Sequence, residues 1–247
     1  MTKTKSYLII ALNTVIILTV ILCLYFMSNR SLESLGFVGS EPISYRIFLF
    51  VNVIAAILLG IGSIAMIIAA TTYLIQKRPA LHFLKNAYIL KMVATVWMSY
   101  VFVMTIFVRL PSSSAGQNII AGEQSVLNIV LPIIAMGVFT FLEYKKTRFY
   151  VVFYSLIPQI VFMIVMLGAV YSGGSQAAIG REAPYIIFRF KTNSPVFSVL
   201  INIAIIVSSG VIGAGIYFAN WTMFEKTYPR LATRKYQQQL LESGREV

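Results

Sequence analysis

The sequence predicts an all-α membrane protein, a polytopic bundle of six transmembrane helices. Three observations support this fold class. Of the 247 residues, 58% are hydrophobic, and the mean hydropathy is +0.82. Only 11% are charged, whereas soluble domains carry about 25%. Six apolar runs are long enough to cross a bilayer, for which about 20 residues suffice. This composition excludes a soluble enzyme and a disordered regulator.

The first three runs are predicted to be spans at residues 7–26, 46–75 and 87–108. The first follows Lys3 and Lys5 but ends without a clear small-x-small cleavage site, so we interpret it as a retained anchor. The second is longer than a bilayer requires and must tilt, bend or project.

The last three runs are predicted to be spans at residues 126–142, 150–170 and 196–218, with an extension of the last to residue 223 left open. Pro132 and Pro158 lie inside the fourth and fifth runs. Each proline leaves a carbonyl without its usual donor, which a neighbouring helix or water must satisfy. Residues 1–223 therefore form one six-span domain, and residues 224–247 form a basic cytoplasmic tail.

The basic residues predict the orientation. With six spans, fourteen of the 20 Lys and Arg residues lie on the side of both termini, and six lie on the other. Cytoplasmic loops carry an excess of Lys and Arg, so both termini are predicted to be cytoplasmic. The net charge of +12 then reflects topology, and we expect no nucleic-acid partner. We expect a location in the plasma membrane of a bacterium.

Residues that could perform catalysis are scarce. The sequence has one His, His82, one Cys, Cys23, and no Asp. A catalytic triad needs an orienting acid, and a metal site usually needs several such ligands. Lys91, about a turn inside the third run, is expected to snorkel to the interface. All Glu residues, Glu143 among them, fall in loops, tails or span ends. We therefore predict no catalytic residue, metal or cofactor, and we disfavour proton-coupled transport.

Uncharged polar residues inside the spans suggest a cavity for a ligand headgroup. The alternative is ordinary hydrogen bonding between helices. The candidates for a polar cavity are Asn52, Asn128, Ser99, Ser155 and Asn202.

Small residues in the last run predict close helix packing. Ser209 with Gly213, and Gly210 with Ala214, form small-x-x-x-small pairs that let another helix approach. We expect packing within one bundle rather than in a dimer.

Two further features lie outside the spans. The last outer loop is aromatic, and we consider it either a lid over the bundle or an interfacial anchor with no ligand. Its candidate lid residues are Tyr185, Phe188 and Arg189. The C-terminal tail carries a juxtamembrane basic cluster that could contact anionic lipid or could only signal topology. Its members are Lys226, Arg230, Arg234 and Lys235.

The ordered motifs carry a family resemblance over about residues 45–220. They include Phe-Val-Arg-Leu-Pro at 107–111, Leu-Asn-Ile-Val-Leu-Pro at 127–132 and Ala-Pro-Tyr at 183–185. The chain resembles small six-span bacterial membrane proteins that are distantly similar to the androgen-induced-gene family of animal membrane hydrolases. That resemblance implies intramembrane cleavage of fatty-acid esters of hydroxy fatty acids by a Thr and a His.

The two groups that the resemblance implies are missing here. The His would be expected at Asn128, and the Thr a few residues before Asn52, where the sequence is Phe-Leu-Phe-Val. Because Asn cannot act as a general base, we do not expect this hydrolase activity in the chain.

The expected function is a non-catalytic integral membrane protein that binds a lipid-like or amphipathic ligand, or a partner membrane protein. Two alternatives stay open: a lipid-ester hydrolase with a noncanonical nucleophile, and a transporter or transport subunit. A hydrolase would need a base beside its hydroxyl, and a transporter would need a continuous polar pathway.

Overall fold

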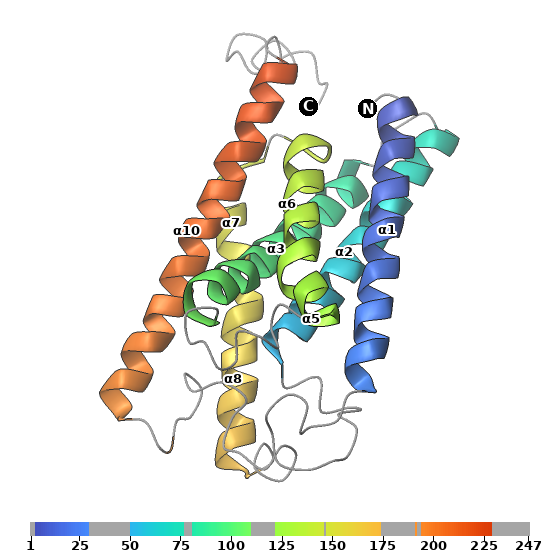
Figure 1. Cartoon of the computed structure of the whole chain (residues 1–247). Helices are drawn as coiled ribbons and strands as arrows, with labels where there is room; N and C mark the ends of the chain where they lie inside the picture. Colours follow the sequence, from blue (N-terminus) through green and yellow to red (C-terminus); the bar gives the residue numbers. More distant parts are fainter. Residues whose placement is uncertain are drawn as a thin grey trace.

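The computed structural model describes residues 3–29, 50–76, 81–109, 122–145, 147–173, 191 and 194–228. Every regular element within these ranges is helical (Figure 1). In chain order the elements are α1 (Lys3–Ser28), α2 (Val51–Gln76), α3 (Leu81–Met104), the π-helical η3 (Thr105–Arg109), α5 (Glu123–Ser125), the π-helical η4 (Val126–Val130), α6 (Leu131–Phe141), α7 (Val151–Tyr154), α8 (Ile157–Tyr171) and α10 (Pro195–Thr227).

Within the described residues, five helices are long and apolar enough to cross a membrane by length and composition. They are Lys3–Ser28, Val51–Gln76, Lys85–Phe107, Val151–Tyr171 and Val196–Thr227. The fourth predicted span forms the shorter apolar helix Val126–Phe141, about 24 Å long against a hydrocarbon core of about 30 Å. The chain is therefore an α-helical multi-pass membrane protein.

The helices run alternately up and down the bundle (Figure 1). The start of α1, the end of α6, the start of α7 and the end of α10 lie at one end, the upper end in this view. We call this the basic end, because these segments carry Lys5 near the start of α1, Lys145 and Arg148 between α6 and α7, and Lys226 near the end of α10.

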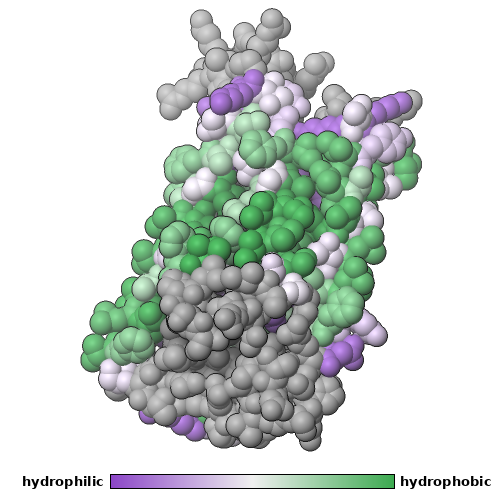
Figure 2. Space-filling model, viewed as in Figure 1, coloured by the Kyte–Doolittle hydropathy of each residue, from purple (hydrophilic) through white to green (hydrophobic). Residues whose placement is uncertain are grey.

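The surface of the bundle is apolar around its middle, as a membrane-embedded surface must be. Hydrophobic residues cover the middle of the face in Figure 2, and hydrophilic residues lie near its upper and lower ends. Large exposed side chains include Leu18 and Ile21 on α1, Ile164 on α8 and Val211 on α10.

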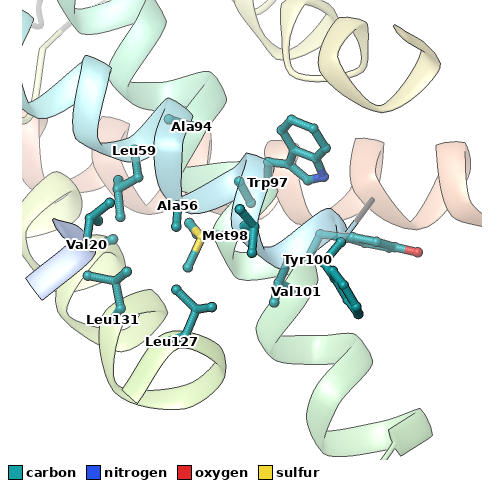
Figure 3. Packing of buried hydrophobic residues seen from close by; sticks show 14 of the residues in the cluster. Val20, Ala56, Leu59, Ala94, Trp97, Met98, Tyr100, Val101, Leu127 and Leu131 are labelled. Atoms are coloured by element: carbon teal, nitrogen blue, oxygen red, sulfur yellow. The ribbon is translucent and has the colours of Figure 1, made fainter. Parts of the chain in front are cut away.

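The core is a tight contact of α1, α2, α3, α6 and α8. In Figure 3, Ala56 and Leu59 of α2 and Leu127 and Leu131 surround Met98 of α3. Small residues on α2 allow the close approach: a Cβ added at Gly62 would lie 3.1 Å from the Cα atom of Lys91. A larger side chain there would force α2 and α3 apart.

Both proline-containing runs are interrupted near their prolines. Pro132 lies at the start of α6, directly after the π-helical turns of η4. Pro158 lies at the start of α8, after the break at residues 155 and 156 that ends α7. Proline cannot donate to the carbonyl four residues earlier, which explains both interruptions. The last helix, by contrast, continues beyond its predicted end at residue 218 to Thr227.

Candidate functional site

Lys91 is completely buried in the bundle, at 0% exposure. Its Nζ atom donates to Oδ1 of Asn13 on α1 at 2.8 Å and to Oγ of Ser63 on α2 at 2.6 Å. The prediction that Lys91 snorkels to the interface is therefore wrong. Gly62 is the physical reason, because its missing side chain leaves room for the Lys91 stem, whose Cδ atom lies 3.5 Å from the added Cβ position.

Glu143, just beyond the end of α6, also turns into the bundle and is 3% exposed. Its Oε1 atom accepts from Nδ2 of Asn13 at 2.5 Å, and the same Nδ2 donates to the carbonyl of Ile9 at 2.9 Å. The argument from sequence that the bundle holds no buried carboxylate is therefore also wrong. Sequence position placed Glu143 correctly at a span end but did not give the direction of its side chain.

Together these residues form an ammonium–amide–carboxylate chain, which we call the Lys91 cluster: Asn13, Ser63, Lys91 and Glu143. It joins α1, α2, α3 and the end of α6. The Oε2 atom of Glu143 is buried and has no hydrogen-bond partner in the described part of the chain. A buried charge is tolerated only when it is paired and hydrogen-bonded, so holding this cluster in the core is costly.

A second polar group joins α2 to the π-helical turns of η4. Nδ2 of Asn52 donates to Oδ1 of Asn128 at 2.9 Å, and Nδ2 of Asn128 donates to Oε1 of Gln124 at 3.0 Å. All three side chains are buried. Asn52 and Asn128, two of the five cavity candidates, therefore meet. Their amides hydrogen-bond to one another and offer no general base.

The third site is where α10 meets α3, α7 and α8, which we call the α3–α8–α10 seam. A Cβ added at Gly213 would lie 2.9 Å from Oγ of Ser155 and 3.2 Å from Cγ1 of Val152. One helical turn away on α10 lies Ser209, which is fully buried. Gln159 lies one helical turn after Ser155, in α8, and shares a face of that helix with Phe162. The ring of Phe162 contacts the ring of Trp97 on α3, with 6.1 Å between the centroids.

Several polar atoms in the seam lack hydrogen bonds. Gln159 is 3% exposed, and neither its Nε2 nor its Oε1 has a partner within the described ranges. The same holds for Nε1 of Trp97 and Oγ of Ser209. Farther along α10, buried Oγ of Ser198 and Oδ1 of Asn202 also lack partners there. Such atoms are expensive in a bilayer, so a polar guest, water or ligand, is expected to meet them.

The other cavity candidates do not join Asn52 and Asn128. Ser99 donates to the carbonyl of Thr95 at 2.7 Å, and Ser155 to that of Val152 at 2.5 Å. Nδ2 of Asn202 donates to the carbonyl of Ser198 at 2.5 Å. Ser155 instead lies in the seam next to Gly213, and Asn202 lies farther along α10.

The small residues of α10 pack within the bundle. Gly213 makes the closest approach, Gly210 lies 4.0 Å from Leu156 when given a Cβ, and Ala214 packs against the core group that contains Tyr88 and Met92.

The remaining site candidates fall largely outside the described residues. This applies to the lid residues Tyr185, Phe188 and Arg189 and to Arg230, Arg234 and Lys235 of the basic cluster. Lys226 lies exposed in the last turn of α10.

Sequence reasoning missed Asn220, which is buried near the basic end. Its Oδ1 accepts from the Tyr88 hydroxyl at 2.7 Å and from the Lys145 backbone N–H at 3.1 Å, and its Nδ2 donates to the Phe139 carbonyl at 2.9 Å. It ties α10 to α3 and α6. It lies beyond residue 218, where the last span is predicted to end, but inside the extension to residue 223 that the sequence left open, and it was not among the candidates.

The basic end carries its charges on short connections and helix ends. The Nζ atom of Lys5 lies 3.4 Å from the centroid of the Tyr144 ring. Burial lowers the pKa of Lys145, and the positive charge of Lys85 lowers it further. Within the described ranges, no group of three or more His, Cys, Asp or Glu residues could hold a metal ion.

Comparison with known proteins gives no match: no family model, no curated protein and no solved structure matches the chain. The resemblance to relatives of the androgen-induced-gene family therefore stays a prediction.

Proposed function

We propose that the chain is a non-catalytic integral membrane protein that binds one amphipathic, lipid-like ligand in the α3–α8–α10 seam. The observation that carries the proposal is Gln159, a nearly fully buried amide without a hydrogen-bond partner in the described part of the chain. Leaving a buried polar group unsatisfied costs about 1–3 kcal/mol, so a polar partner at Gln159 stabilises the bundle.

The surroundings of Gln159 suit a molecule with one polar and one apolar part. Trp97 Nε1 and Ser209 Oγ offer further hydrogen bonds to a polar head. The outer faces are apolar, with Ile160 and Ile164 exposed on α8 and Val207 exposed on α10. A ligand that enters from the bilayer would keep its tail on these faces and its head in the seam.

The chemistry of the seam favours binding over turnover. A hydroxyl nucleophile needs an adjacent base. Oγ of Ser155 donates to a backbone carbonyl, and no His or carboxylate lies beside Ser155 or Ser209 in the described parts of α3, α8 and α10.

We extend the proposal to the topology: six crossings, with both termini cytoplasmic, in the plasma membrane of a bacterium. The continuous helical segment Glu123–Phe141 is about 28 Å long, close to the hydrocarbon thickness of about 30 Å. The alternating helix directions and the charge of the basic end support this arrangement.

The test is a native mass spectrum of the full chain in mild detergent, with the Gln159→Leu variant and a matched control, Gln124→Leu. Gln124 is also a buried glutamine, but its Oε1 accepts a hydrogen bond from Asn128 outside the seam. We expect a stoichiometric lipid-like species on the wild type and on Gln124→Leu, and its loss from Gln159→Leu. A bare wild-type chain, or retention by Gln159→Leu, contradicts the proposal.

A second candidate function, a transporter or transport subunit, is favoured by the Lys91 cluster. Ionisable residues inside a membrane usually mark ion pathways or relays. The test is dissipation of an imposed proton gradient in proteoliposomes. Flux through the wild type that is lost in Glu143→Gln supports this candidate, and an equal leak through both excludes proton coupling at Glu143.

A further inference from the structure

We infer that the seam takes an amphipathic ligand with an uncharged headgroup of the hydroxyl-and-ester class, as in a monoacylglycerol. The inference rests on the proposed function and names the chemistry of its ligand. Its basis is the depth, the charge and the hydrogen-bonding groups of Gln159, Trp97 and Ser209.

The three residues lie deep in the membrane-spanning helices. At 1.5 Å per residue, Gln159 lies about 18 Å from the Tyr171 end of α8, and Ser209 lies about 20 Å from the Val196 end of α10. Trp97 lies midway along the apolar helix Lys85–Phe107. The headgroup site is therefore near the middle of a hydrocarbon layer about 30 Å thick.

The three helices of the seam carry no charged side chain at this depth. Residues 92–107 of the third span, 157–171 of α8 and 196–217 of α10 contain no Lys, Arg, Asp, Glu or His. Lys91 directs its ammonium group to Asn13 and Ser63 on α1 and α2. A phosphate, carboxylate or ammonium headgroup would be desolvated here without a counter-charge, which is costly in the interior of a bilayer.

The free hydrogen-bonding groups complement a neutral head. Trp97 Nε1 can only donate, the Gln159 amide can donate twice and accept, and the Ser209 hydroxyl can do both. An ester carbonyl can accept from Trp97 or Gln159, while a ligand hydroxyl can donate to Gln159 and accept from Ser209. A purely apolar guest would leave all three side chains unsatisfied.

The expected position of the ligand's acyl chain follows from the first half of α10, the half that begins at Pro195. A Cβ added at Gly213 would lie close to Val152 and Ser155, and the ribbons of α10 and α8 diverge toward the lower end in Figure 1. In this half Val196, Phe197, Val199 and Leu200 are exposed on nearly every side of the helix. An acyl chain anchored at Gln159 would lie between these side chains and α8.

Trp97 provides the test, because the chain has only two tryptophans. In liposomes that hold no other protein, the full-length Trp221→Phe variant leaves Trp97 as the only tryptophan in the sample. It is titrated with three probes that carry the same brominated acyl chain, a quencher that acts only at contact: monoacylglycerol, lysophosphatidylcholine and lysophosphatidylglycerol. Trp97 is buried, so bulk lipid does not reach it, and saturable quenching reports binding in the seam.

We expect saturable quenching by the monoacylglycerol alone. Gln159→Leu should weaken its binding about tenfold, the equivalent of about 1.4 kcal/mol for the lost hydrogen bonds. Ser209→Ala should weaken binding, whereas Ser208→Ala should not, since Ser208 donates to the Ile205 carbonyl within its own helix.

The other outcomes separate the two proposals. Equal or tighter saturable binding of a charged or zwitterionic probe, sensitive to Gln159→Leu, overturns the uncharged headgroup and leaves the seam as a ligand site. Saturable binding that is insensitive to Gln159→Leu overturns the placement of the headgroup. If no probe quenches Trp97 saturably while native mass spectra show a Gln159-dependent ligand, the headgroup class is wrong. If both experiments are negative, the proposed function fails as well.

Discussion

The Nζ atom of Lys91 donates to Oδ1 of Asn13 over 2.8 Å, and both side chains are fully buried between α1 and α3. Asn13 accepts from a cation through its oxygen and donates to the Glu143 carboxylate through its nitrogen. The amide therefore links two opposite charges that start from different helices. This arrangement makes the attachment of α1 to the bundle depend on both charges being present.

Lys91→Met should strongly destabilise the bundle, because it leaves the Glu143 carboxylate buried without its counter-charge. Breaking a buried pair typically costs about 3–5 kcal/mol. The measurement is the free energy of unfolding in mixed detergent micelles. Lys85→Met is the control, because Lys85 is exposed, and it should change this free energy little.

The double variant Lys91→Met with Glu143→Gln should recover most of that loss, since it removes both charges together. Strict additivity of the two single losses would show that Lys91 and Glu143 do not interact, and would contradict the cluster as described.

The contact of Asn52 with Asn128 makes a separate prediction about α2 and η4. A double-mutant cycle with Asn52→Ala and Asn128→Ala should give a coupling energy of about 0.6–1.7 kcal/mol, the range for hydrogen bonds between membrane helices. Thr14→Ala, combined with either substitution, should show no coupling, because the exposed Thr14 hydroxyl bonds only to the Ile10 carbonyl of its own helix. A coupling near zero for the Asn pair would mean that the two amides do not meet in the bilayer.

Hydropathy was sufficient to predict the helical membrane class, because each long helix coincides with an apolar run. It could not predict the burial of Lys91. A lysine near a span end can snorkel or turn inward, and the choice depended on Gly62 of α2 and Asn13 of α1, which are distant in sequence. The meeting of Asn52 and Asn128 likewise depended on the order of helices in the bundle.

The seam was only partly predictable, for a related reason. Small residues at Ser209 and Gly213 indicate close packing, but they do not identify the helix that approaches them. Gln159 is important because its buried amide has no hydrogen-bond partner in the described part of the chain, and a sequence pattern cannot show that. The helix α10 continues through Asn220 and Trp221 to Thr227, although these two residues lower the local hydropathy from which the span end at residue 218 was predicted.

The close contact at Gly213 leads to a prediction about packing, for which the nearby Gly215 provides the control variant. In Gly213→Ala the new Cβ would lie 2.9 Å from Oγ of Ser155 and 3.2 Å from Cγ1 of Val152, so these side chains or α10 must shift, at a cost of about 1–3 kcal/mol. Gly215→Ala is the matched variant, because its Cβ would meet nothing within 4 Å, and it should be neutral or slightly stabilising. Thermal unfolding of the two variants in one detergent is the measurement. Equal stability would contradict the close contact at the seam.

The six-crossing topology predicts which helix ends face the same compartment. Single cysteines are introduced in a Cys23→Ala background as Arg148→Cys, Ser172→Cys and Thr227→Cys, and intact cells are treated with a membrane-impermeant thiol reagent. Arg148→Cys and Thr227→Cys lie at the basic end and should be labelled only after lysis, whereas Ser172→Cys, at the opposite end of α8, should be labelled in intact cells.

This pattern depends on the short helical segment Glu123–Phe141. If this segment returned to the side from which it entered, every later connection would change compartment. Arg148→Cys and Thr227→Cys would then be labelled in intact cells and Ser172→Cys only after lysis, while the start of α1 stayed inside. That reversed pattern would establish five crossings. It would also place the basic residues that follow α6 outside, against the bias that orients membrane helices.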